Sequence, residues 1–132
     1  EVQLPFLQQI LREFSLIPLV VGQISAREVS EVIETFWNEP DMLFLISSDL
    51  SHYLDYDTAR HCDQATCKAI EELHPENIDY ENACGRLPVS GILLSAKNHH
   101  LKVQTLDLRN SGDTAGGKDR VVGYGCWAFY PE

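Results

Sequence analysis

Apolar runs and amphipathic stretches alternate along the first half of the chain. Residues 1–14 carry leucine and phenylalanine at helical spacing, which predicts an amphipathic helix. Two short apolar runs, 16–22 and 42–46, are bounded by glycine or polar residues and predict buried strands. Between them, Ser25 and Glu28 have the spacing of a capping box and predict the start of another helix. A short crossover from strand through helix to strand favours parallel pairing, in a sheet covered on both faces.

The second half of the chain predicts three further helices and then two strands. The helices are expected over residues 58–73, 77–83 and 88–99, and the strands over 101–108 and 121–130. Asp57 is the expected cap of the first of these helices. A polar, glycine-rich loop joins the two strands, which predicts an antiparallel pair. The predicted fold is therefore α/β in three layers: a mixed, mostly parallel sheet with helices on both faces, ending in an antiparallel strand pair.

The composition narrows the class of protein. A length of 132 residues fits one domain. Twenty acidic and ten basic residues give a net charge of −10, which argues against nucleic acid as a partner. No run approaches the ~20 apolar residues of a membrane span, and no secretory leader opens the sequence. The four cysteines include no CxxC pair, so we expect free thiols and a reducing, cytoplasmic setting.

A cluster of polar residues follows the apolar run 42–46. It consists of Ser47, Ser48, Asp49, Ser51 and His52. Ligands of α/β sheets bind outside the carboxyl ends of the strands, on loops held by a rigid scaffold. Asp49 and His52 are therefore the first candidates for chemistry. The alternative is that these side chains only form hydrogen bonds with the loop backbone.

Cys84 is the second candidate. Gly85 lets the backbone turn, Arg86 brings a positive charge, and the helix expected near Pro88 would direct its amide groups toward the loop. These conditions stabilise a thiolate, as nucleophile or as metal ligand, whereas the alternative is a small buried apolar residue. If the two loops converge, Asp49, His52 and Cys84 suit either a metal site or an acid/base pair.

The glycine-rich loop between the last two strands resembles a phosphate-binding loop only in part. Gly112, Gly117 and Lys118 have Walker A spacing. Asp119, however, stands where serine or threonine should bind magnesium, and a strand follows where a helix is required. We therefore interpret the segment as a mobile hairpin loop at the edge of a pocket, with Asp113 and Lys118 as candidate binding residues.

Four motifs in this order resemble the Memo-like family, whose bacterial and archaeal members are called AmmeMemoRadiSam system protein B. They are EVQLPFLQ from Glu1, SSDLSHY from Ser47, CGRLPV from Cys84 and NSGDTAGGKDRVVGYG from Asn110. The resemblance extends over essentially the whole chain but covers only the carboxyl-terminal part of that family's domain. It implies the α/β fold of the class III extradiol dioxygenases, which hold non-haem iron.

The resemblance also implies roles for particular residues. It makes Cys84 a ligand of iron or copper, together with two histidines from motifs that precede EVQLPFLQ in the family and are not in this chain. Asp49 and His52 match an Asp-x-x-His motif that would supply an acid/base or a substrate contact. Because a cysteine replaces the dioxygenase carboxylate, redox or oxygen chemistry is implied more than ring cleavage. Without both histidines we expect weak metal binding and no turnover.

Two other functions stay open at this point. One is a non-catalytic module that binds phosphorylated peptides, with Arg86 and Lys118 as anion contacts. The other is an accessory protein for a radical SAM partner, as the bacterial family name implies. Substrate contacts are expected at Ser48, Arg86, Asp113 and Lys118.

The start of the sequence leads to a further expectation. The only methionine is Met42, so we expect a chain that begins within a fold, as a fragment, a processed product or half of a split protein. The missing amino-terminal part, or another chain, would then cover an open sheet edge and apolar surface.

Overall fold

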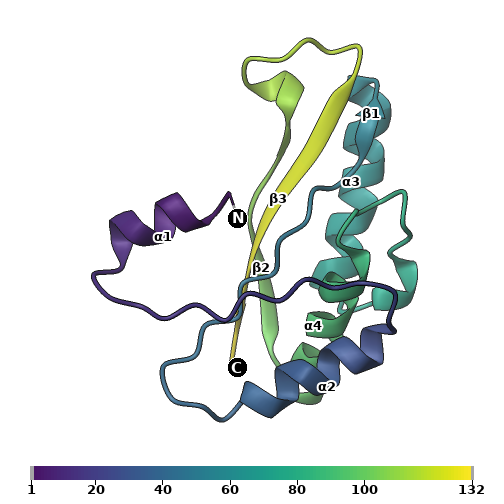
Figure 1. Cartoon of the computed structure of the whole chain (residues 1–132). Helices are drawn as coiled ribbons and strands as arrows, with labels where there is room; N and C mark the ends of the chain where they lie inside the picture. The colour runs from purple at the N-terminus through teal and green to yellow at the C-terminus, as the bar shows by residue number, and fades with distance from the viewer. Residues whose placement is uncertain (1, 132) are drawn as a thin grey trace.

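The computed structural model describes residues 2–131 and has a mixed helix and strand architecture, so the predicted α/β class is confirmed (Figure 1). The helices are α1 (Leu4–Ile10), α2 (Ala26–Phe36), α3 (Tyr56–Glu71) and α4 (Arg86–Asn98), and the strands are β1 (His52–Leu54), β2 (Lys102–Asn110) and β3 (Val121–Tyr130). Two short 3-10 helices are η1 (Pro75–Asn77) and η2 (Ser111–Asp113).

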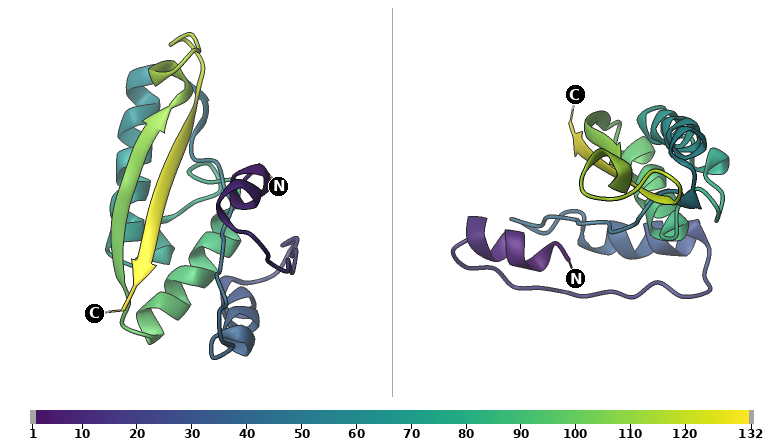
Figure 2. Two further views of the ribbon diagram at one scale, coloured as in Figure 1. Left: turned by 90° about the vertical axis from the view of Figure 1, so that its left-hand side faces the viewer. Right: turned by 90° about the horizontal axis from the view of Figure 1, so that it is seen from above.

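The sheet has three strands in the order β1-β3-β2. The pair formed by β2 and β3 is antiparallel, as predicted, and runs from Lys102 opposite Tyr130 to Asn110 opposite Gly123. The short strand β1 also pairs with β3 in antiparallel orientation, through His52 opposite Val122. Helix α3 packs along β2 and β3 (Figures 1 and 2). The prediction of a mostly parallel sheet is thus wrong for the described residues, in which each strand pairing is antiparallel.

The two apolar runs that were predicted as parallel strands are extended but form no ladder within residues 2–131. In the first run, 16–22, Leu19 is 64% exposed and Val20 fully exposed. In the second, 42–46, exposed and partly buried residues alternate, and Phe44 and Ile46 pack against the core. A buried strand needs a hydrogen-bonded neighbouring strand as well as apolar side chains. The apolar pattern of one segment indicates the side chains but not the neighbouring strand.

Most of the predicted helices are present, with shifted ends. Helix α1 ends at Ile10, so it is shorter than the predicted 1–14. The cap of α3 is Asp55, whose Oδ1 accepts the amide hydrogen of Thr58 at 3.1 Å, and the prediction of Asp57 as the cap is wrong. The region 77–83, predicted as a short helix, holds turns after η1. Within residues 2–131, no helix has both the length and the apolarity needed to cross a bilayer.

The predicted capping box at the start of α2 is confirmed. Ser25 Oγ accepts the amide hydrogen of Glu28 at 3.2 Å, and Glu28 Oε2 accepts that of Ser25 at 2.7 Å. Ser25→Ala should lower the free energy of unfolding by about 1 kcal/mol, since the Glu28 amide loses its acceptor and the Glu28 carboxylate loses the Ser25 hydroxyl. Urea unfolding followed by circular dichroism measures this. Gln23→Ala, two residues before the cap, is the control and should change stability by less than about 0.5 kcal/mol. Equal effects of both variants would contradict the prediction.

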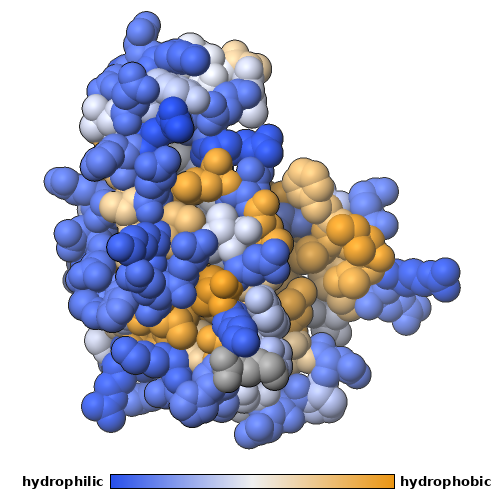
Figure 3. All heavy atoms as spheres, turned by 180° about the vertical axis from the view of Figure 1, so that it is seen from behind, coloured by the Kyte–Doolittle hydropathy of each residue, from blue (hydrophilic) through white to orange (hydrophobic). Residues whose placement is uncertain are grey.

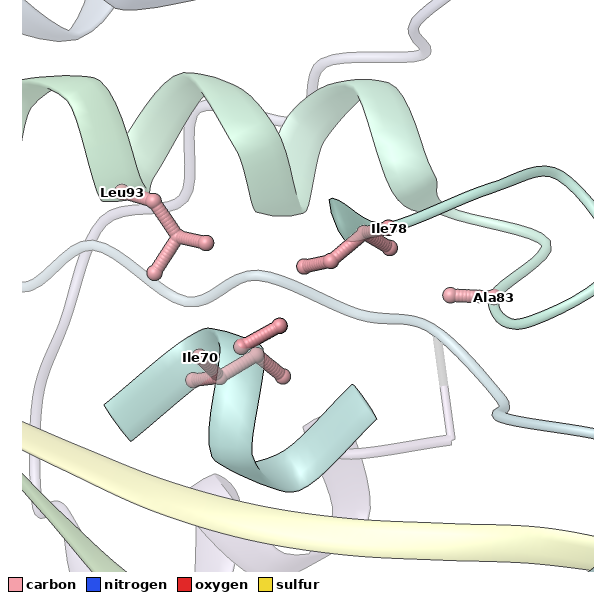
Figure 4. Packing of buried hydrophobic residues seen from close by; sticks show 5 residues of the cluster. Ile70, Ile78, Ala83 and Leu93 are labelled. Atoms are coloured by element: carbon pink, nitrogen blue, oxygen red, sulfur yellow. The ribbon is translucent and has the colours of Figure 1, made fainter. Parts of the chain in front are cut away.

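Helix α4 packs against both α2 and α3 in the hydrophobic core. Leu93 is fully buried between α3 and α4, in a cluster with Ile70, Ile78 and Ala83 (Figure 4). On its other side α4 packs against α2, where a Cβ at Gly91 would lie 2.6 Å from Val29 Cβ. Such close packing leaves α4 little freedom to shift. The core therefore fixes the position of the α4 amino terminus and of the residues just before it.

Candidate functional site

Three predicted site residues come together at the loops around β1 and before α4. The possible ligand atoms of Asp49, His52 and Cys84 all lie within 4.8 Å of one another. Asp49 Oδ2 lies 3.8 Å from His52 Nε2, and the Asp49 amide donates to Cys84 Sγ at 3.4 Å. The side chains of Asp49 and His52 are 51% and 33% exposed, so the group is open to solvent. We call these three residues the Asp49–His52–Cys84 cluster.

Gly85 allows the two loops of the cluster to meet. Its amide donates to Ser48 Oγ at 2.9 Å, and a Cβ on Gly85 would lie 2.7 Å from Ser48 Cβ and 2.8 Å from the Ser47 carbonyl oxygen. Ser48 Oγ in turn lies 3.8 Å from Cys84 Sγ. Ser48, predicted as a substrate contact, is thus placed beside the thiol. A side chain larger than hydrogen at Gly85 would push the loops apart.

His52 is held by backbone pairing and by a buried carboxylate. The Leu50 amide donates to the Gly123 carbonyl at 2.9 Å, and the Gly123 amide donates to the Ser51 carbonyl at 2.9 Å. The Ser51 amide donates to Oδ1 of Asp63 at 3.0 Å. Asp63 lies on α3 and is only 3% exposed. These bonds fix the backbone on both sides of residue 51, immediately before His52.

Sequence reasoning missed Asp63. Burial raises its pKa above the usual range for a carboxyl group, and the hydrogen bond from the Ser51 amide partly opposes that rise. Its spacing of four residues from both Ala59 and Cys67 puts it on the buried stripe of α3. A carboxylate on a helix stripe otherwise made of small or uncharged residues is the signal that could have found it.

Comparison with known proteins identifies the family. The sequence profile of the family described as Memo-like protein matches residues 1–128. The chain belongs to the Memo-like family. A MEMO1 family protein from Metallosphaera sedula is 34% identical over 94% of this chain and 48% of its own length. One from Aquifex aeolicus is 36% identical over 94% of this chain and 51% of its own length. The chain therefore spans about half the length of these relatives.

Asp113 and Lys118, which were predicted as substrate contacts, both contact Tyr56, the first residue of α3. The Tyr56 hydroxyl donates to Asp113 Oδ1, and Lys118 Nζ lies 4.3 Å from the centre of the Tyr56 ring. The bond from Tyr56 lowers the pKa of Asp113, and the same bond raises the pKa of Tyr56. The Tyr56 amide also donates to the Lys118 carbonyl at 3.0 Å. Asp113 and Lys118 thus tie the glycine-rich loop to α3.

Arg86, the last predicted contact, is the first residue of α4 and lies two positions after Cys84. Its Nε is buried and has no hydrogen-bond partner within residues 2–131. A buried guanidinium N–H without a partner is costly, so an acceptor from a ligand or from another chain would stabilise it. The structure thus places Arg86 at the start of α4, two positions after Cys84, with an Nε donor that no described residue satisfies.

The donor atoms of the cluster fit a transition metal. Metal bonds of ~2.0–2.3 Å let donors up to ~4.6 Å apart share one ion, so the 4.8 Å limit of the cluster requires only small rotations of exposed side chains. Thiolate and imidazole suit iron and copper. The Asp49 carboxylate can either add a third ligand or orient the His52 imidazole.

Proposed function

We propose that this chain supplies one side of a non-haem metal site of the dioxygenase-like kind, with Cys84 as a ligand of iron or copper. The observation that carries the proposal is the convergence of the cluster from two loops that are distant in sequence but held in contact by Ser48 and Gly85. Iron or copper bound there would supply one-electron and oxygen chemistry.

In this proposal the other two residues of the cluster handle protons. The partly exposed His52 imidazole can take a proton from a bound substrate or return one to it. The Asp49 carboxylate, 3.8 Å from His52 Nε2, attracts the protonated imidazole and orients the ring toward Cys84. Ser51 forms hydrogen bonds with Gly123 and Asp63. These bonds fix the backbone next to His52, so its imidazole is positioned before the proton transfer.

We further propose that the segment corresponding to the uncovered half of the relatives completes the site and covers the apolar face of this chain. Its support is the exposure of Leu19, Val20, Leu43 and Leu45, each at least 50% exposed. Hydrophobic side chains also gather on the side of the molecule that carries α1, at the right of Figure 3. Segment 11–24 runs along the outside of α2, where a further layer can pack on it (Figure 2).

Metal content tests both parts of the proposal. The chain is exposed anaerobically to Fe²⁺ or Cu⁺, desalted and measured by elemental analysis, alone and together with that second segment. We expect near-stoichiometric metal in the mixture and clearly less in the chain alone, because two further ligands come from the segment. Absence of metal from both samples would contradict the proposed metal site, and equal metal in both would contradict the shared one.

A second candidate function is supported by Arg86. Its unpartnered Nε, two positions after Cys84, favours a non-catalytic module that binds a phosphorylated peptide. Arg86→Gln distinguishes the two functions, since it should weaken peptide binding in this module but leave metal affinity within about threefold. Isothermal titration with a phosphorylated and an unphosphorylated form of one peptide measures the difference.

A further inference from the structure

A small polar cavity separate from the Asp49–His52–Cys84 cluster lies between α3 and the end of β2. Its volume is about 100 Å³. The polar residues that line it are Arg60, Asp63, Gln64, Arg109, Asn110 and Asp113. None of the three cluster residues lines this cavity. A cavity of this size holds a small molecule or a head group, because sites for larger ligands measure ~300–1,000 Å³.

Asn110 presents an unused donor at this cavity. The residue is 1% exposed, and its Oδ1 accepts the Gly112 amide hydrogen at 2.9 Å. Its Nδ2 is buried and has no hydrogen-bond partner within residues 2–131. Nearly all buried polar groups in folded proteins find a partner, so an acceptor close to this amide would stabilise it.

The carboxylates that line the cavity are already engaged with the protein. Asp113 accepts hydrogen bonds from the Tyr56 hydroxyl and, at 2.9 Å, from the Asn110 amide. Asp63 Oδ1 accepts from the Ser51 amide at 3.0 Å, and both Asp63 oxygens lie against Gly123. These acceptors are therefore directed toward the backbone and the loop, and a cation would find few free oxygens.

The guanidinium groups, by contrast, keep most of their donors. Each arginine side chain carries five N–H donors. Of the N–H donors of these two side chains, Arg60 and Arg109, one has a protein acceptor in the described part of the chain. It is Arg109 Nε, which lies 2.7 Å from Asp107 Oδ2. The free donors of the cavity thus outnumber its free acceptors.

We propose that this cavity binds a small oxyanion, either a carboxylate or a phosphate group, through Arg60, Arg109 and Asn110 Nδ2. Guanidinium groups bind both anions through paired, charge-assisted hydrogen bonds. Asn110 also lines the cavity, and its buried Nδ2 is a donor without a partner among the described residues. The proposal does not depend on the proposed metal function, because Arg60, Arg109 and Asn110 do not belong to the Asp49–His52–Cys84 cluster.

Nuclear magnetic resonance of the ¹⁵N-labelled chain tests the proposal. The side-chain amide signals of Asn110 are followed while sodium acetate or sodium phosphate is added at constant ionic strength, with sodium chloride as the balancing salt. We expect a saturable shift of these signals below about 50 mM for one of the two anions. The anion that saturates first identifies the group as a carboxylate or a phosphate.

Two substitutions make the outcome specific. Arg60→Gln should weaken the anion about tenfold, because an exposed side chain of α3 loses its charge without disturbing the core. Arg120→Gln is the matched control: its guanidinium lies 5.0 Å from the Tyr53 ring centre and is not among the residues that line the cavity. Absence of a saturable shift with either anion, or equal weakening in both variants, would overturn the proposal.

Discussion

Gly123→Ala should lower the free energy of unfolding by about 3 kcal/mol. A Cβ at this position would lie 2.5 Å from Cγ and 2.6 Å from Oδ1 of Asp63, too close for either group to remain in place. Asp63 is 3% exposed and cannot move without leaving the Ser51 amide unpaired. The variant thus combines overpacking, at ~1–3 kcal/mol, with a buried unsatisfied donor, at ~1–3 kcal/mol.

The matched control is Gly117→Ala in the loop before β3. No heavy atom lies within 4 Å of a Cβ at Gly117, so this variant should change stability by less than about 0.5 kcal/mol. Urea unfolding of both variants and the parent chain measures the difference. A Gly123→Ala variant as stable as Gly117→Ala would show that Asp63 does not hold the backbone before His52.

The sequence allowed the local elements to be predicted better than the sheet. The capping box at Ser25 and the antiparallel pairing of β2 with β3 depend on residues close in sequence, and both are present. Segments 16–22 and 42–46 have the composition of strands, but a ladder depends on a neighbour that the pattern of one segment cannot report. Strand β1 was missed for the opposite reason, because its three residues lie in a polar stretch and are defined by their pairing with β3.

For the candidate site, too, the sequence indicated local positions but not the contacts between distant segments. Asp49 and His52 were predicted as candidates because they follow the apolar run 42–46, and Cys84 because it precedes a helix; the structure brings the three together. The support of Ser51 by Asp63 links residues 12 positions apart through the packing of α3 on the sheet. The contact of Tyr56 with Asp113 spans 57 positions. Such links follow from tertiary packing, which single-sequence patterns do not encode.

Cys84→Ser should lower the affinity for Cu⁺ or Fe²⁺ by at least about 100-fold, because changes in groups that merely support a ligand already cost ~10–100-fold. The serine hydroxyl stays protonated at neutral pH and is a hard ligand, whereas the cysteine thiolate is soft and charged. Serine can still accept the hydrogen bond from the Asp49 amide, so stability should change by less than about 1 kcal/mol. Competition with a chromophoric metal chelator under anaerobic conditions measures the affinity.

Cys126→Ser is the matched control, since Cys126 is also an exposed free thiol but lies on β3, outside the cluster. A loss of affinity shared by both variants would point to adventitious binding by surface thiols. Unchanged affinity in Cys84→Ser would remove the metal role of Cys84 and leave the anion contact at Arg86 as the better account of the site. A loss confined to Cys84→Ser would tie the metal to the one thiol that the Ser48 and Gly85 contacts hold beside His52, as the metal function requires.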